Sequence, residues 1–474
     1  MRKTFLAISL VTLSAATAAW VWSARRSNQP RGVFLIVVDT LRPDRLSCYG
    51  YTKHATPNMD SLAELGTRFT NAHAAGSWTV PSMGAIMVGK YPTQLGLVEL
   101  PVPPDHRFQW REHRRQILHK LPPHTRTLAS VMGEAEFRTA GFVNQPALNY
   151  TNGFLQGFVD WFYPAKIDEI RQHDPAGLPI FQEWPSLKYA NRSDAALVQA
   201  FDRWMGEHAK DRPFVWLHFL TPHRPYEPPP ADMGAATEEE MKQLPPSDRY
   251  DAEIRIVDRL VGQVLQTIER TMGLDRALIV LVSDHGEAFG EHDMNEHGHS
   301  LHAEVVHVPL VIAGPRVAQG AVVQQRIRLL DLFPTIVELA GVKRPLPDGL
   351  EAVSFVPVLK GLEQPRPWYA EGMLYGSTER SLAIGRHRLM WDQQDDVYQL
   401  FDVVNDPGEL HDLLADLPAE AGRLKSHLEA HAFRLQEDFD RSLREQLAAW
   451  GQRQRAAESE EELKALRSLG YVDE

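Results

Sequence analysis

Short, unbroken apolar runs alternate with amphipathic stretches along most of the chain. Val33–Val38 is rich in β-branched residues, and Phe214–Leu220 and Ala277–Val282 have the same character. Apolar runs of this length are typical of strands that helices cover on both faces. In Tyr250–Thr271 apolar residues instead recur every three or four positions, which predicts a helix. Strands that alternate with helices predict an α/β fold with a mainly parallel sheet.

The pattern changes after about Gly361. Ser381–Trp391 and Val397–Val404 have the pattern of short antiparallel strands, and we expect a helix from near Ala419. These elements predict a smaller α+β subdomain at the C-terminus, and the charged residues after it predict a solvated helix with loose ends. The expected organisation is an N-terminal segment at 1–30, a main domain at 31–361, a C-terminal subdomain at 362–435 and a charged tail at 436–474.

The N-terminal segment has the pattern of an export sequence. Arg2 and Lys3 precede an apolar run that extends from Phe5 to Trp22 and contains several small residues. The run is also long enough to cross a bilayer, which takes roughly 17–25 residues. We therefore expect an exported protein, periplasmic or extracellular. The segment is then either a cleaved signal peptide or a retained membrane anchor.

Composition and charge narrow the function classes. The chain has 474 residues, of which 43% are hydrophobic and 24% charged, as in ordinary globular proteins. Its net charge of −12 argues against nucleic acid as a partner. A single cysteine, Cys48, excludes an internal disulfide.

We expect two long surface loops, at Pro101–His124 and Glu227–Ser247. Long loops often border binding sites.

Polar residues follow three of the predicted strands. Asp39 comes after the first, His223 after the second, and Asp284 and His285 after the third. A parallel sheet binds ligands at the C-terminal ends of its strands. A single aspartate at such a position is often a helix cap, but four residues after three strands favour a common site. Two carboxylates and an imidazole can bind a divalent cation.

Thr79 is a candidate nucleophile. It lies in Gly76–Ser82, just before a segment, Met83–Val88, whose small and apolar residues suit a buried helix. The N-terminus of a helix favours negative charge, and a hydroxyl that also touches a cation loses its proton more readily. The alternative is that Thr79 only caps the helix.

Several motifs occur in a characteristic order along the chain. They are Val37–Gly50 with Thr56–Asp60, Thr79–Gly89 with Tyr91-Pro92, Thr221–Tyr226, Ser283–Glu287 with Gly290–His292, His307–Leu310, and Leu400–Glu409. Together they resemble the sulfatase family of the alkaline phosphatase superfamily, over roughly residues 32–415. The resemblance implies an alkaline-phosphatase-like sheet flanked by helices, followed by a smaller C-terminal subdomain.

The chain departs from the family pattern in several places. Sulfatases carry a cysteine or serine at the nucleophile position, which is converted to formylglycine, and Thr79 cannot give that aldehyde. Met83 replaces an arginine of the family, and Thr40 replaces the second aspartate of an Asp-Asp pair. Asn144–Pro146 stands where the family often has a Lys-x-His pair. A later lysine is replaced by the histidines of Glu296–His299.

The resemblance implies the site residues and their roles. It implies that one divalent metal ion, zinc, manganese or calcium, is bound by Asp39, Thr79, Asp284 and His285, with no other cofactor. Thr79 would attack the ester. His223, or one of His297 and His299, would protonate the leaving oxygen.

Three functions fit these observations. The first is a metal-dependent hydrolase of sulfate or phosphate esters, with a glycan or a lipid-linked molecule as substrate. The second is an envelope transferase similar to phosphoethanolamine transferases and lipoteichoic acid synthases, which use a threonine nucleophile. The third is a binding protein that keeps the sulfatase fold without catalysis.

Overall fold

The computed structural model describes residues 29–97, 120–122, 124–145, 147–148, 152–163, 190–372, 374 and 378–456. Residues 1–28 of the proposed signal or anchor segment, most of the Pro101–His124 loop and the last 18 residues of the charged tail, 457–474, lie outside these ranges. Among the helices that are described, none is both long and apolar enough to cross a membrane.

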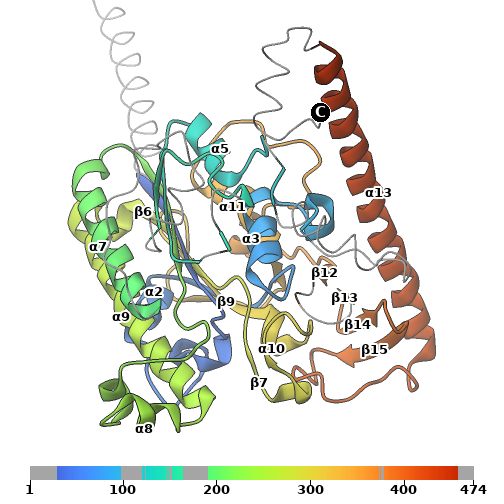
Figure 1. Ribbon diagram of the computed structural model, residues 1–474, viewed down its shortest axis with the longest axis horizontal. Coiled ribbons are helices and arrows are strands. Elements are labelled where there is room, and N and C mark those ends of the chain that lie inside the picture. Colours follow the sequence, from blue (N-terminus) through green and yellow to red (C-terminus); the bar gives the residue numbers. More distant parts are fainter. Residues whose placement is uncertain are drawn as a thin grey trace, which may run out of the picture.

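A nine-stranded sheet forms the centre of the described structure (Figure 1). The central strand β1 pairs in parallel with β5 on one side and with β6 on the other. The strand order is β10 (Ala321–Val323), β2 (Gly66–His73), β9 (His307–Ala313), β6 (Ala277–Val282), β1 (Gly32–Val38), β5 (Pro213–Phe219), β3 (Arg138–Val143) and β4 (Asp160–Phe162), with β11 (Ile327–Arg328) also paired to β2.

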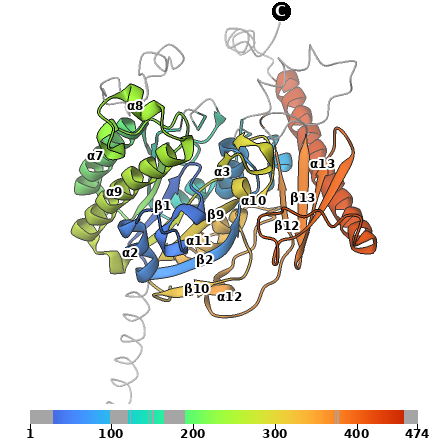
Figure 2. The same ribbon diagram turned by 90° about the horizontal axis from the view of Figure 1, so that it is seen from below.

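Helices cover both faces of this sheet, as the unbroken apolar runs predicted. All seven residues of β1 are buried. Val33, Leu35 and Val37 point to one apolar core, and Phe34, Ile36 and Val38 to the other. The first core contains α3 (Thr79–Val88), α5 (Leu128–Glu134) and α11 (Leu332–Leu339), and the second contains α2 (Pro57–Leu65), α7 (Ala190–His208) and α9 (Pro246–Met272) (Figure 2).

The sheet is mainly parallel, which confirms the expected fold class. Strand β9 is the exception, because it runs antiparallel to both β2 and β6. Strand β2 therefore runs in the same direction as β1, β5 and β6. Its C-terminal end, His73, lies at the same edge of the sheet as theirs, and the segment that leads to Thr79 starts there.

A second, antiparallel sheet and a long helix form the C-terminal part. The sheet has the order β12 (Trp368–Glu371), β13 (Glu379–Ile384), β14 (His387–Asp392) and β15 (Val397–Asp402). Helix α13 (Pro418–Ala456) packs along it, with Leu424 and Leu428 buried against Leu389 and Leu400 (Figure 1). The shorter elements are α8 (Glu238–Lys242), α10 (Ala303–Val306), α12 (Val356–Leu359), β7 (Ala288–Phe289) and β8 (Asn295–Glu296).

Candidate active site

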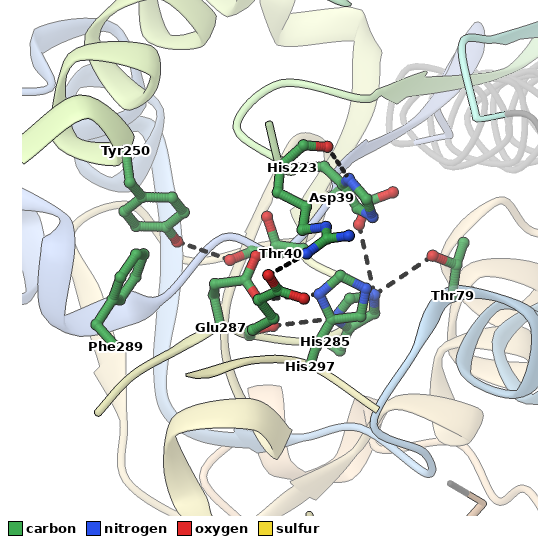
Figure 3. A network of polar contacts seen from close by, with 12 residues as sticks. Asp39, Thr40, Thr79, His223, Tyr250, His285, Glu287, Phe289 and His297 are labelled. Carbon is green, nitrogen blue, oxygen red and sulfur yellow. Dashed lines mark hydrogen bonds and ion pairs between the residues drawn. The ribbon is translucent and has the colours of Figure 1, made fainter. Parts of the chain in front are cut away.

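Two adjacent parallel strands bring three candidate metal ligands together. Asp39 directly follows β1, and Asp284 and His285 follow β6 after one intervening residue. All three side chains are completely buried. Nε2 of His285 lies 3.4 Å from Oδ1 of Asp39 and 3.5 Å from Oδ2 of Asp284 (Figure 3). Asp39 and His285, 246 positions apart in the chain, thus face one another, as the strand-end argument predicted.

The ring of His285 is oriented by the backbone of the next residue, Gly286. Its Nδ1 lies 2.9 Å from the carbonyl oxygen of Gly286, so Nδ1 carries the proton and the lone pair of Nε2 faces the carboxylates. Burial lowers the pKa of His285 to about 3, with the neighbouring His297 adding to the effect. The neutral imidazole is the form that binds metals. Gly286 has no room for a side chain, because a Cβ there would lie 2.1 Å from the carbonyl oxygen of Glu304.

The two carboxylates leave oxygens without hydrogen-bond partners. Oδ1 of Asp39 and Oδ2 of Asp284 are both buried, and neither has a hydrogen-bond partner among the residues that the structure describes. Burial and the charge of Asp39 raise the pKa of Asp284 well above its usual value. Burial also opposes ionisation of Asp39, but the hydrogen bond from His218 and the nearby His223 and His285 lower its pKa overall. Within the described residues this is the one cluster of acidic and histidine side chains that could hold a cation. Its donor set fits zinc or manganese, and its carboxylates also suit calcium.

Thr79 joins this cluster from a third segment. It is the first residue of α3, and Trp78 occupies the N-cap position without a side-chain capping bond. Thr79 is therefore not the helix cap, which was the alternative interpretation. Its Oγ1 instead lies 3.3 Å from Nε2 of His285, at the N-terminal end of the helix (Figure 3). Free backbone N–H groups and the helix dipole favour negative charge there.

The C-terminal sheet braces the segment that carries Thr79. The hydroxyl of Ser77 donates to the carbonyl of Gly372, just after β12, at 2.9 Å. The indole of Trp368 in the same strand donates to the carbonyl of Ala74 at 3.0 Å. The carbonyl of Ser77 accepts the N–H of Gly298, the neighbour of His297. The position of Thr79 thus depends on a subdomain almost 300 residues further along the chain.

His297 and His223 lie beside the cluster. The ring centroid of His297 is 4.5 Å from that of His285 and 4.8 Å from that of His223 (Figure 3). Nδ1 of His297 lies 2.9 Å from Oε1 of the buried Glu287. Burial alone would lower the pKa of His297, but the charge and hydrogen bond of Glu287 raise it overall. His297 can therefore present a protonated Nε2, and the half-buried His299 stands two residues further on.

Two residues of the site were not predicted from the sequence. Gln145, after β3, donates from Nε2 to Oδ2 of Asp39 at 2.5 Å and lies 3.3 Å from Oγ1 of Thr79. His218, in β5, has its Nε2 at 3.4 Å from the same oxygen of Asp39. A histidine inside an otherwise apolar strand was the signal for His218. For Gln145 the signal was its place in Asn144–Pro146, where the family often has a Lys-x-His pair.

Two departures from the family pattern have clear structural consequences. Met83 is fully buried in the apolar core beside α11, so it cannot face the site as a charged residue would. Thr40 has a left-handed backbone, with φ of 57°, and its carbonyl accepts the hydroxyl of Tyr250 at 2.6 Å. Its own hydroxyl is buried without a partner. The described part of the site therefore lacks both the arginine and the second aspartate.

The fold and the geometry of the site together identify a protein superfamily. The sheet, the flanking helices and the clustered carboxylates are those of the alkaline phosphatase superfamily. A family model described as Sulfatase matches residues 31–342, and one described as N-sulphoglucosamine sulphohydrolase, C-terminal, matches residues 290–438. The chain belongs to the sulfatase family.

Individual relatives agree with this assignment. The chain is 23% identical to a Delta 4,5-hexuronate-2-O-sulfatase of Bacteroides thetaiotaomicron, over 89% of this chain and 92% of the relative. A structure solved with its substrate D-glucosamine-2-N,6-O-disulfate has a TM-score of 0.67 at 19% identity, covering 86% of this chain and 98% of the other. The phosphonate monoester hydrolase of Agrobacterium radiobacter has a TM-score of 0.62 at 22% identity, covering 86% and 96%. At these identities the two structures show the shared fold.

Proposed function

We propose that the protein is a metal-dependent ester hydrolase in which Thr79 is the nucleophile. The observation that carries the proposal is the position of the Thr79 hydroxyl, 3.3 Å from the imidazole nitrogen that also faces Asp39 and Asp284. A drifting, inactive fold has no need to keep a hydroxyl, two carboxylates and an imidazole in one buried cluster, because unpaired buried charges destabilise it.

Asp39, Thr79, Asp284 and His285 would hold one divalent ion. When bound, the ion supplies a positive charge that favours the deprotonated hydroxyl and the negative charge that builds up on the reacting ester. The unpaired oxygens of Asp39 and Asp284 support this assignment, because they would gain the partner that they otherwise lack.

Each of the site residues then has its own role in the reaction. Thr79 Oγ loses its proton to solvent and forms a bond to the phosphorus or sulfur of the ester. The bond to the leaving oxygen breaks, and Nε2 of His297 donates a proton to that oxygen, with His223 beside it as a second donor. Water then attacks the ester on Thr79, which releases the anion and restores the threonine hydroxyl. Free N–H groups at the start of α3 face the developing charge.

The charge of the site favours an ester whose reacting group carries a single negative charge. Arg42 is held by Asp44 and Glu291, and Arg224 is paired with Glu296. The site residues just described contribute histidines and an amide, with no lysine or arginine among them. Sulfate monoesters, phosphodiesters and phosphonate monoesters meet this condition, and the sulfated sugars named for the relatives suggest a glycan. Phosphoryl transfer to Thr79 parallels the threonine chemistry of the related transferases.

The decisive experiment is an assay of the purified full chain on sulfate monoesters, phosphodiesters and phosphonate monoesters, with and without bound metal. Thr79→Val is compared with Thr52→Val, because Thr52 is exposed and lies outside the site. Mass spectrometry should find a substrate-derived group on Thr79 after rapid acid quenching. Turnover that Thr79→Val leaves unchanged would disprove the proposal.

The same assay separates the alternatives. Product formation that requires an added alcohol acceptor would identify a transferase. No bound metal and no turnover on any ester would identify a binding protein.

We further propose that residues 1–30 export the protein and leave it periplasmic, extracellular or membrane-attached. N-terminal sequencing of the mature protein, together with membrane fractionation, tests this.

A further inference from the structure

Gln145 reaches the reacting hydroxyl from a fourth strand. Strand β3 is parallel to β5, and its last residue pairs with His218. The N–H of Asn144 donates to the carbonyl of His218 at 3.0 Å, which continues the pairing for one more residue. Gln145 therefore emerges at the same edge of the sheet as Asp39. Its side chain is almost completely buried, at 6% exposure.

The orientation of the Gln145 amide is fixed by its neighbours. Its Oε1 accepts the backbone N–H of Ala147 at 3.1 Å, so the nitrogen must face the site. Nε2 lies 2.5 Å from Oδ2 of Asp39 and 3.3 Å from Oγ1 of Thr79. An amide nitrogen carries two hydrogens, and the geometry provides one acceptor for each of them.

A donor at this position determines what the Thr79 oxygen can do. Because Nε2 of Gln145 has no lone pair to accept a proton, Oγ1 of Thr79 must be the acceptor in this contact. The hydroxyl hydrogen is then directed elsewhere, and its loss leaves an oxygen anion that keeps the amide as a partner. A neutral donor aimed at a developing anion in a buried site favours the anion. The second hydrogen keeps Oδ2 of Asp39 occupied, so that Oδ1 remains the oxygen that faces His285.

We propose that Gln145 is a catalytic residue, whose amide donates a hydrogen bond to the Thr79 oxygen during its attack on the ester and fixes the orientation of Asp39. The neutral amide of Gln145 donates a hydrogen bond to the Thr79 oxygen, as a cationic group at the same edge of the sheet would. This inference rests on the proposed function, since it assigns Gln145 to the attack by Thr79.

The surroundings hold Gln145 rigidly. The side chain of Asn144 donates to Oδ1 of the buried Asp194 at 2.6 Å. The same carboxylate accepts the backbone N–H groups of Leu220 and Thr221 at 3.1 and 2.8 Å. The segment of Gln145 and the loop that carries His223 thus share one anchor. Groups held in this way keep the positions that catalysis requires.

Gln145→Met tests the proposal, because it keeps the length of the side chain and removes both donors. We expect kcat to fall about 10²- to 10³-fold, as for the loss of one oxyanion donor, with a much smaller change in KM. The affinity for zinc, measured by competition with a chromophoric chelator, should fall about tenfold or more, because Asp39 loses its partner. Gln399→Met is the matched control, since Gln399 is exposed on β15.

The outcomes distinguish this inference from the proposed function. An active wild-type enzyme with unchanged kcat and zinc affinity in Gln145→Met would overturn the role of Gln145 and leave the nucleophile assignment standing. A wild-type protein without turnover would overturn both. If Gln145→Met fails to fold by circular dichroism, Gln145→Asn replaces it. It keeps an amide that is one methylene too short to reach, and the same losses are expected.

Discussion

Oγ1 of Thr79 lies 3.3 Å from Nε2 of His285, although the two residues are 206 positions apart in the chain. The first comes from the N-terminal end of a buried helix, and the second follows a central strand. The contact ties a nucleophilic hydroxyl to the cluster of carboxylates and imidazole. Each of the predictions about the active site depends on this contact. The prediction about Glu409, which concerns the stability of the C-terminal subdomain, does not.

Replacing Thr79 should separate catalysis from folding. Thr79→Val keeps the shape of the side chain, so we expect the melting temperature to change little while kcat/KM falls at least about 10⁴-fold, as for loss of a nucleophile. Thr79→Ser retains a hydroxyl and should keep part of the activity. Steady-state kinetics and thermal denaturation of both variants provide the measurement. A Thr79→Val enzyme within tenfold of wild type would rule out Thr79 as the nucleophile.

Removing the metal should destabilise the protein as well as inactivate it. At a free metal concentration about a thousand times the Kd, binding adds about 4 kcal/mol to the free energy of unfolding, which chelation removes. Asp284→Asn should bind no metal and therefore show no response to chelator. Elemental analysis and melting curves measure both effects. Asp416→Asn, at an exposed position, should behave like wild type, and a chelator that leaves its melting curve unchanged would argue against a metal centre.

The contribution of His297 should depend on the leaving group. If its Nε2 protonates the leaving oxygen, His297→Gln should lower kcat about 10²- to 10⁴-fold for alkyl or sugar esters, whose leaving groups need a proton. The loss should be much smaller for 4-nitrophenyl esters, which leave readily as anions. His427→Gln, on the exposed side of α13, is the control. An equal loss with both kinds of ester would exclude proton donation by His297.

The charge of the reacting group should determine which esters the enzyme prefers. The site residues that the structure describes include no lysine or arginine, so a phosphate diester or a sulfate monoester with one negative charge should be preferred over a phosphate monoester dianion. We expect kcat/KM for bis(4-nitrophenyl) phosphate to exceed that for 4-nitrophenyl phosphate by about tenfold or more, equivalent to about 1.4 kcal/mol. A preference for the dianion would instead show that a cation outside the described residues reaches the substrate.

Acid should loosen the contact that Glu409 makes between β14 and His302, at the start of α10. Burial opposes its ionisation, but the charge of Arg388 and the hydrogen bond from His302 lower its pKa to about 2. Because the folded pKa lies below the unfolded value of 4.5, this carboxylate stabilises the fold above about pH 4.5, and the effect is lost as the pH falls towards 2.

Glu409→Gln should therefore lower the free energy of unfolding at pH 7 by on the order of 3 kcal/mol and have little effect near pH 2. Urea denaturation across this pH range measures the difference. Glu363→Gln, at an exposed position of the same subdomain, should match wild type throughout. A pH-independent difference between wild type and Glu409→Gln would contradict the assignment of the acid sensitivity to this carboxylate.

The pattern of residues along the chain was enough to predict the architecture and much of the site. The apolar runs predicted the central strands, because a strand covered on both faces must be apolar at every position. Asp39, Asp284 and His285 follow two of these runs, and parallel pairing places such residues at one edge. The change of pattern after Gly361 likewise predicted the second sheet. These features are local in the chain, so composition and spacing were enough.

Which side chains touch Thr79 depends on how distant strands pack together in the folded chain. Gln145 and His218 became part of the site because β3 and β5 pair beside β1, and no local pattern encodes which strands are neighbours. The contacts of Ser77 with Gly372 and Gly298 likewise join distant segments. Hydrogen bonds act over about 3 Å, so such partners depend on how the whole chain packs.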